Sequence, residues 1–202
     1  MSPKQHFPAT ERNREPIFEV LSRVLPASGT LLEIASGTGE HAIWMAPRLP
    51  RLVWQTSDAD PAMRESISAW IAESGATNVR EPLALDVCAW PWPVDNADAI
   101  FCANMIHIAP WAACEGLLRG AGALLAEGAP LVLYGPFKLG GAHTAPSNET
   151  FDASLRQRDP RWGVRDLEAV TALAQTHGLR LDESLALPAN NRAVVFRRVV
   201  GA

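Results

Sequence analysis

The sequence has 202 residues, of which 48% are apolar and 20% are charged, and its formal net charge at pH 7 is −4. This composition argues against a disordered chain, and the negative charge argues against a nucleic-acid-binding protein. The three cysteines lack metal-ligand spacing and no apolar run is long enough for a membrane span. We therefore expect a single domain over residues 1–202, soluble and cytoplasmic, with neither a metal site nor a membrane or nucleic-acid partner.

In chain order, strand and helix patterns alternate. Residues 1–29 are predicted to form a polar segment and one helix, with Pro16 at its first position. Strands are predicted at 30–35, 52–56, 79–85, 97–103 and 130–134, and helices at 40–49, 60–72, 110–125 and 164–177. Asp60 is the predicted cap of its helix, and Asp166 is expected in the first turn of the last one.

The C-terminal third departs from this alternation. Residues 135–163 show no period, and a segment of that length inside a domain is typically functional, so 136–162 is predicted to be a lid loop. Residues 179–187 and 192–200 predict two strands joined by a turn. The pattern indicates an α/β fold with a doubly wound, Rossmann-like, mostly parallel sheet of seven strands and an antiparallel C-terminal hairpin.

An acidic residue stands at or near the end of each of the first three predicted strands. Glu33 stands near the end of the first strand, before the turn Ser36-Gly37-Thr38-Gly39, and Asp58 and Asp86 end the next two. The turn fits the dinucleotide fingerprint, but a pyrophosphate disfavours nearby carboxylates. S-adenosylmethionine, which carries a sulfonium, an ammonium, ribose hydroxyls and an adenine amine, suits three acids at one sheet edge. Structural caps or turns remain the alternative for each acid.

These segments resemble the class I S-adenosylmethionine-dependent methyltransferases. The resemblance rests on residues 33–39, 58–63, 85–87 and 104–107, and it covers residues 30–135. More narrowly, the chain resembles a family of small methyltransferase-like proteins of unknown function, through segments 11–13, 104–111, 134–137, 158–163 and 188–191. Ala35 replaces the first glycine of the superfamily motif, so the backbone there must accommodate a Cβ.

The expected cofactor is S-adenosylmethionine, and its predicted contacts are Glu33, Ala35, Gly37, Gly39, Asp58, Asp86, Val87 and Asn104. Asp58 is expected to accept from the ribose hydroxyls and Asp86 from the adenine amine, while Val87 packs on the adenine ring.

Two residues after the fourth and fifth strands are candidates for the catalytic site. His107 is predicted as a base for the acceptor, with an orienting donor or a core imidazole as the alternatives. Tyr134, the single tyrosine, is predicted to contact the substrate. Further substrate contacts are predicted at Arg12, Asn13, Trp111, Arg156 and Trp162.

The sequence thus predicts methyl transfer to an O, N or S atom of a small molecule. A nicotinamide-dependent oxidoreductase is one alternative, since Tyr134 and Lys138 have a Tyr-x-x-x-Lys spacing, although Pro136 keeps them off one helix turn. A non-catalytic module that binds the cofactor is the other. Neither the acceptor atom nor the oligomeric state follows from these residues.

Overall fold

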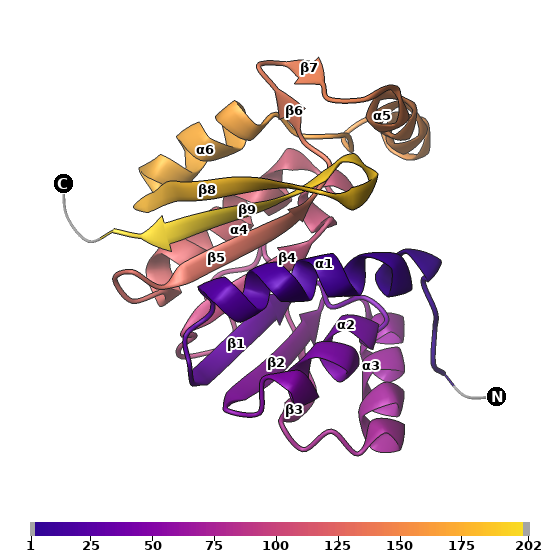
Figure 1. Cartoon of the computed structure of the whole chain (residues 1–202), viewed down its shortest axis with the longest axis vertical. Helices are drawn as coiled ribbons and strands as arrows, with labels where there is room; N and C mark the ends of the chain where they lie inside the picture. The colour runs from indigo at the N-terminus through magenta and orange to yellow at the C-terminus, as the bar shows by residue number, and fades with distance from the viewer. Residues whose placement is uncertain (1–2, 200–202) are drawn as a thin grey trace.

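The computed structural model describes residues 3–199, which form a seven-stranded sheet with helices on both faces (Figure 1). The strands are β1 (Gly29–Ile34), β2 (Leu52–Asp58), β3 (Val79–Ala84), β4 (Ala99–Ala103), β5 (Pro130–Gly135), β8 (Leu179–Leu187) and β9 (Asn191–Arg198). Their order is β3-β2-β1-β4-β5-β9-β8; the first five are parallel, and β9 runs antiparallel to both of its neighbours. This is the predicted sheet, and its order reverses between β1 and β4, where such sheets place their ligand crevice.

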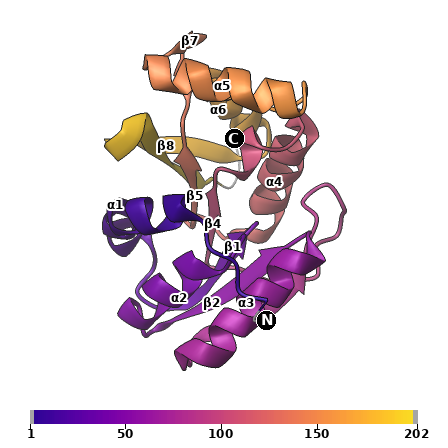
Figure 2. The same cartoon turned by 90° about the vertical axis from the view of Figure 1, so that its right-hand side faces the viewer.

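Helices flank the sheet in two layers. They are α1 (Pro8–Val24), α2 (Glu40–Met45), α3 (Pro61–Ser74), α4 (Trp111–Leu124), α5 (Pro146–Arg158) and α6 (Leu167–Thr176), with 3-10 turns η1 (Ala46–Arg48), η2 (Met105–His107) and η3 (Pro188–Asn190). Figure 2 shows α1 and α4 on opposite sides of the sheet. Because side chains alternate along a strand, Leu31 joins the core under α1 and α2 while Leu32 joins the core under α4 and α6.

Two helices, α3 and α6, begin directly after an aspartate that caps the first turn. Asp60 caps α3 as predicted, accepting a hydrogen bond from the Ala62 N–H at 2.9 Å. Asp166 also caps its helix, accepting from the Ala169 N–H at 3.1 Å, because α6 begins at Leu167, three residues later than expected.

The first helix begins earlier than the sequence predicted. Pro8, not Pro16, occupies the first turn, and Pro16 lies inside the helix. Pro16 removes one intrahelical hydrogen bond, and the burial of apolar residues such as Ile17 and Leu21 compensates for that loss, so the helix continues past the proline.

The expectation of a loop over residues 136–162 was wrong, because this segment contains β6 (Lys138–Leu139), β7 (Ala142–His143) and α5. The buried side chains of α5 are Asn148, Asp152 and Leu155, so polar contacts rather than an apolar stripe hold the helix, and no helical period of hydrophobic residues announces it. Whether the segment acts as a lid stays a prediction.

The last strand ends at Arg198; the expected end at Val200 lies outside the described residues. Within residues 3–199, no helix combines the length and hydropathy of a membrane crossing.

Candidate functional site

The glycine turn joins β1 to α2 at the carboxyl edge of the sheet, and its two glycines have different surroundings. A Cβ on Gly39 would lie 3.0 Å from the Cα of Ile67, so this glycine lets α2 approach α3. A Cβ on Gly37 would meet only the ring of Phe7, at 3.9 Å. The backbone at Gly37 is therefore open to a ligand, and its φ of 58° is one that glycine adopts without strain.

Asp58 holds this turn from the end of β2. Its Oδ2 atom accepts from the Gly37 N–H, and its Oδ1 atom accepts from the Asp60 N–H, both at 2.9 Å. Burial raises the pKa of Asp58, and the two backbone donors oppose that rise. Each carboxylate oxygen can accept more than one hydrogen bond, so Asp58 can still bind a donor at the sheet edge.

Glu33 does not lie at an open strand end. Its side chain is 2% exposed, and Oε2 accepts from the Trp54 indole N–H at 2.9 Å within the layer under α1 and α2. Burial raises the pKa of Glu33 to about 7, although Trp54 and Ser36 oppose the rise. The expectation that all three acids face one open cleft is corrected for Glu33, because its position in β1 directs the side chain into the core.

The next strand ends differ in exposure. Asp86 is exposed, and its Oδ1 accepts from the Cys88 N–H at 2.9 Å. Val87 is 6% exposed and belongs to the core under α4, so its side chain is not an open surface for a ring. Asn104 has a left-handed φ of 61°, and its N–H donates to the Tyr134 carbonyl at 2.7 Å, which fixes the end of β4 against β5.

Ala35 also adopts a left-handed conformation, with a φ of 54°. The backbone thus accommodates a Cβ at the position of the missing motif glycine, as the sequence required, in a region that glycine would occupy with less strain.

His107 is fully buried, and its geometry favours an orienting role over a base. Its Nδ1 accepts from the Arg165 N–H at 3.2 Å, so the neutral ring carries its proton on Nε2. Burial, with the nearby Arg165 charge, lowers the pKa of His107 to about 3. The His107 carbonyl also accepts from the Gly163 N–H at 2.9 Å, so this residue attaches η2 to the segment after α5.

Tyr134, Asn13 and His41 form a polar chain under α1. The Asn13 Oδ1 bonds the His41 Nε2 at 2.8 Å. Asn13 also interacts with Tyr134, where it opposes the rise that burial causes in the pKa of the tyrosine. Burial lowers the pKa of His41 to about 4, so its ring is neutral and donates to Asn13. Arg12, Asn13 and Tyr134 line one pocket, which unites three of the predicted site residues.

The other predicted substrate contacts lie elsewhere, around α4 and α5. The guanidinium of Arg165 lies 5.6 Å from the ring centre of Trp111, and that of Arg158 lies 5.3 Å from the ring centre of Trp162. Arg156 is half exposed, and its Nε donates to Asp152 at 3.3 Å. None of Trp111, Arg156 and Trp162 lines the pocket of Arg12.

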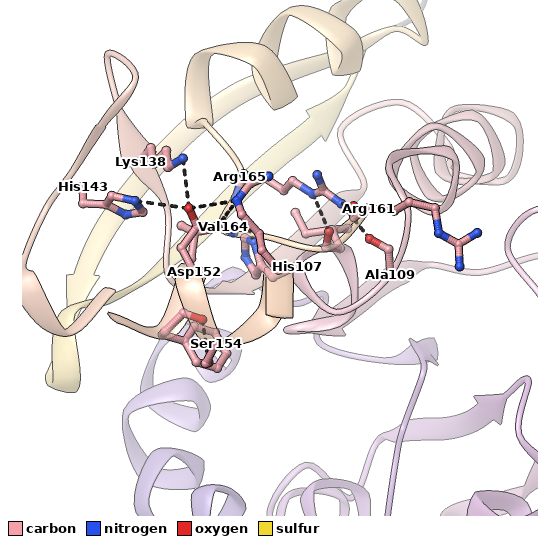
Figure 3. Close-up of polar contacts among 12 residues, drawn as sticks. His107, Ala109, Lys138, His143, Asp152, Ser154, Arg161, Val164 and Arg165 are labelled. Atoms are coloured by element: carbon pink, nitrogen blue, oxygen red, sulfur yellow. Dashed lines mark hydrogen bonds and ion pairs between the residues drawn. The ribbon is translucent and has the colours of Figure 1, made fainter. Parts of the chain in front are cut away.

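Asp152 fastens α5 to its neighbours (Figure 3). It accepts from the Val164 N–H at 2.7 Å and pairs with the Lys138 Nζ and the His143 Nε2, each at 3.3 Å. Arg165 extends this attachment, because its guanidinium donates to the Ala109 carbonyl at 2.6 Å (Figure 3) and to the Ile106 carbonyl at 2.8 Å. Helix α5 is therefore attached both to the residues that precede it and to those that follow it.

Two contacts at the glycine turn have no clear signal in the sequence. The Phe7 N–H and the Thr38 hydroxyl both donate to Glu40 Oε2, at 2.9 and 2.7 Å. These two contacts place the Phe7 ring over Gly37, and Phe7 itself is 49% exposed. A lone Phe in a polar N-terminal segment resembles any surface residue, which is why this contact was missed.

Two alternative site chemistries can be compared with the geometry. Tyr134 lines a pocket with Asn13, while Lys138 lies outside that lining and pairs with Asp152, so the Tyr-x-x-x-Lys spacing does not bring its two side chains into one site. Among residues 3–199, the structure contains no group of three or more His, Cys, Asp or Glu side chains that could hold a metal ion.

The family model described as "Protein of unknown function (DUF938)" matches residues 4–198. Among solved structures, an O-methyltransferase family protein from Burkholderia thailandensis superposes with a TM-score of 0.80 at 16% identity, over 96% of this chain and 58% of that one. The mitomycin 7-O-methyltransferase MmcR gives 0.78 at 19% identity, over 93% and 54%. CalO1, a methyltransferase in calicheamicin biosynthesis in its SAH-bound form, gives 0.73 at 16%, over 94% and 55%.

These likenesses show the fold: the sheet and its helices are those of methyltransferases. The chain spans only 54–58% of the length of the three solved proteins.

Proposed function

We propose that this chain, which belongs to the DUF938 family of proteins of unknown function, is an S-adenosylmethionine-dependent methyltransferase that acts on a small molecule. When bound, the cofactor supplies a methyl group on a positively charged sulfur. The methyltransferase fold of its structural neighbours supports the proposal, and the residues at the carboxyl edge of the sheet support it independently.

The observation that carries the proposal is the pair formed by Asp58 and the glycine turn. A carboxylate bonded to the Gly37 N–H occupies the place where a dinucleotide would set its pyrophosphate, and repulsion disfavours that ligand. A ribose diol has donors that this carboxylate can accept, and the open backbone at Gly37 gives it room. The residues present therefore fit a nucleoside carrying a positive charge.

The proposed roles follow the positions of the side chains. Asp58 holds the ribose, and the exposed Asp86 accepts from the adenine amine. Gly37 gives the cofactor room at the turn, and Asn104, whose backbone N–H already bonds Tyr134, contacts the cofactor through its side chain. Phe7 covers the turn from outside. Glu33 and Ala35 act indirectly, by shaping the strand end, and Gly39 by packing α2 on α3.

On the acceptor side, the proposed work is positioning. Methyl transfer to a correctly aligned nucleophile needs little proton chemistry, so a neutral His107 that attaches η2 to residues 163–165 suits the reaction without serving as a base. Arg12, Asn13 and Tyr134 would contact the substrate, and Trp111, Arg156 and Trp162 would shape the far side around α4 and α5. We further propose that the substrate is neither nucleic acid nor a membrane component, and that the protein acts in the cytoplasm.

Calorimetry tests the cofactor class directly. We expect S-adenosylmethionine and S-adenosylhomocysteine to bind and NAD to release no binding heat. Tight binding of NAD without either sulfur compound would refute the proposal. If S-adenosylhomocysteine binds but a broad screen of hydroxyl, amine and thiol compounds gives no methylated product, the non-catalytic binding module is favoured.

A substitution at Asp58 tests the observation on which the proposal rests, the pair formed by this carboxylate and the glycine turn. Asp58→Ala is expected to weaken S-adenosylhomocysteine binding by about 1.5–3 kcal/mol, the range for hydrogen bonds to a charged group, measured by titration calorimetry. Asp58→Asn, which keeps an acceptor for Gly37, separates loss of charge from loss of the turn. Asp60→Ala is the matched control: it removes the cap of α3, at about 1 kcal/mol of stability, and leaves cofactor affinity unchanged. An unaltered dissociation constant for Asp58→Ala would mean that Asp58 only holds the turn.

A further inference from the structure

A pocket of about 340 Å³ lies between the first turns of α1 and the connection from β8 to β9. Its lining residues are Ala9, Arg12, Asn13, Pro16, Tyr134, Pro188, Ala189 and Asn191. The four from α1 recur at helical spacing and so form one face of that helix. Because Tyr134 lines it, the pocket lies at the carboxyl end of β5. The Tyr134 carbonyl accepts from the Asn104 N–H at the end of β4.

The charge in this pocket is one-sided. Arg12 is exposed, and within residues 3–199 it forms no ion pair or side-chain hydrogen bond. No Asp or Glu is among the lining residues, although acids outnumber bases in the chain as a whole. An unpaired guanidinium in a pocket with no acidic lining residue favours an anion, and its planar fork fits a carboxylate with two parallel hydrogen bonds.

Tyr134 contributes a donor that is set by its neighbours. The Asn13 Oδ1 already accepts from the N–H of neutral His41, so the neighbouring Asn13 amide offers Tyr134 N–H donors. Within residues 3–199 the Tyr134 hydroxyl donates to no other group, so it keeps its own proton to donate. Because Tyr134 lines the pocket, that proton is available to an oxygen of a bound ligand.

The opposite wall is apolar and held in place. Pro16, Pro188 and Ala189 all line the pocket, and both Ala189 and Asn190 have a left-handed φ of 58°. The Asn190 carbonyl accepts from the Asn148 side chain at 2.9 Å, which ties this turn to α5. These residues give the lining an apolar part that suits a flat or short apolar body, and the pocket volume is at the lower end of the ~300–1,000 Å³ usual for small-ligand sites.

We propose that this pocket binds the acceptor as a small organic acid, with its carboxylate on Arg12 and Tyr134 and its apolar body between Pro16 and Pro188. The role of the acid as methyl acceptor rests on the proposed function; its binding to the pocket does not. Arg12 would then select acids over neutral analogues of the same shape.

Three acids and their amides test the inference on the full chain: benzoate, phenylacetate and 3-phenylpropionate against benzamide, phenylacetamide and 3-phenylpropionamide. Binding is followed by NMR titration, with S-adenosylhomocysteine affinity measured separately by calorimetry. At least one acid is expected to bind about ten-fold or more tightly than its amide. Arg12→Gln is expected to abolish that preference, Arg12→Lys to retain part of it, and Tyr134→Phe to weaken acid binding a few-fold.

Arg80→Gln is the matched control, since Arg80 is exposed on β3 and outside the pocket, and it should retain the preference. Equal binding of every acid and its amide, or an unchanged preference in Arg12→Gln, would overturn the inference. So would an equal loss of S-adenosylhomocysteine affinity in Arg12→Gln, because Arg12 would then hold the amino-acid carboxylate of the cofactor. Acid preference without S-adenosylhomocysteine binding would refute the proposed function and leave the acid pocket standing.

Discussion

Asp152→Ala is expected to lower the free energy of unfolding by about 3 kcal/mol, as measured by urea denaturation at pH 7. The change leaves the buried Val164 N–H without its acceptor and removes the partner shared by Lys138 and His143. The side chains of Lys138 and His143 are each about one-fifth exposed, so solvent recovers part of the loss.

The pH dependence of this variant follows from the pKa of Asp152. Burial raises that pKa, but the Val164 N–H and the Lys138 ammonium outweigh it and hold the value below the ordinary one. A carboxyl whose pKa is depressed on folding stabilises the protein above its unfolded value, near 4, and loses that effect as the pH falls through its folded value. The difference between wild type and Asp152→Ala should therefore shrink below about pH 4.

Two further variants make the Asp152 result specific. Asp152→Asn keeps an acceptor for Val164 and should lose less stability than Asp152→Ala. Glu149→Ala, on an exposed position of the same helix, should stay within about 0.5 kcal/mol of wild type. If Asp152→Ala is as stable as Glu149→Ala, α5 is held by other contacts and the anchoring described here is wrong.

Glu33→Gln is expected to be more stable than wild type by about 3 kcal/mol at pH 8, and to match it near pH 4.5. Burial raises the pKa of Glu33 from 4.5 to about 7, so the folded protein retains a proton that the unfolded chain has lost. At 1.36 kcal/mol per pH unit, wild-type stability falls by about 3 kcal/mol as the pH rises through this range. Glutamine needs no ionisation and can still accept from Trp54.

Buried histidines act in the opposite direction. Burial lowers the pKa of His41 to about 4 and of His107 to about 3, so acid destabilises the folded protein as the unfolded chain takes up these protons. Both proteins carry these histidines, so the effect cancels in the comparison. Thermal unfolding at pH 4.5, 6 and 8 measures the difference, and Glu65→Gln, at an exposed position of α3, is the control. Equal stabilities at pH 8 would show that Glu33 is solvated in the folded protein.

Local chemistry determined most of the fold from the sequence. Along the chain, apolar strands are followed in turn by amphipathic helices, and this order specified a parallel sheet covered by helices on both faces. The last hairpin followed from the turn residues between its two strands. Asp60 was identified as a helix cap and residues 36–39 as a turn because each of these structures depends only on neighbours within a few residues. Local signals were weak in the polar helix α5, where the apolar residues show no helical period.

Only the tertiary structure decided what each site residue faces. Glu33 lies within β1, the strand that leads to the turn, and the pleat directs its side chain under α1 toward Trp54. The sequence does not reveal which face of that strand is covered. His107 is buried because residues 163–165 fold back onto η2. Arg12, Tyr134 and Ala189 meet in one pocket across more than a hundred residues of chain, which depends on how α1 and the β8–β9 turn pack against β5. Such contacts arise from the packing of complete elements, so they have no signature in any short stretch of sequence.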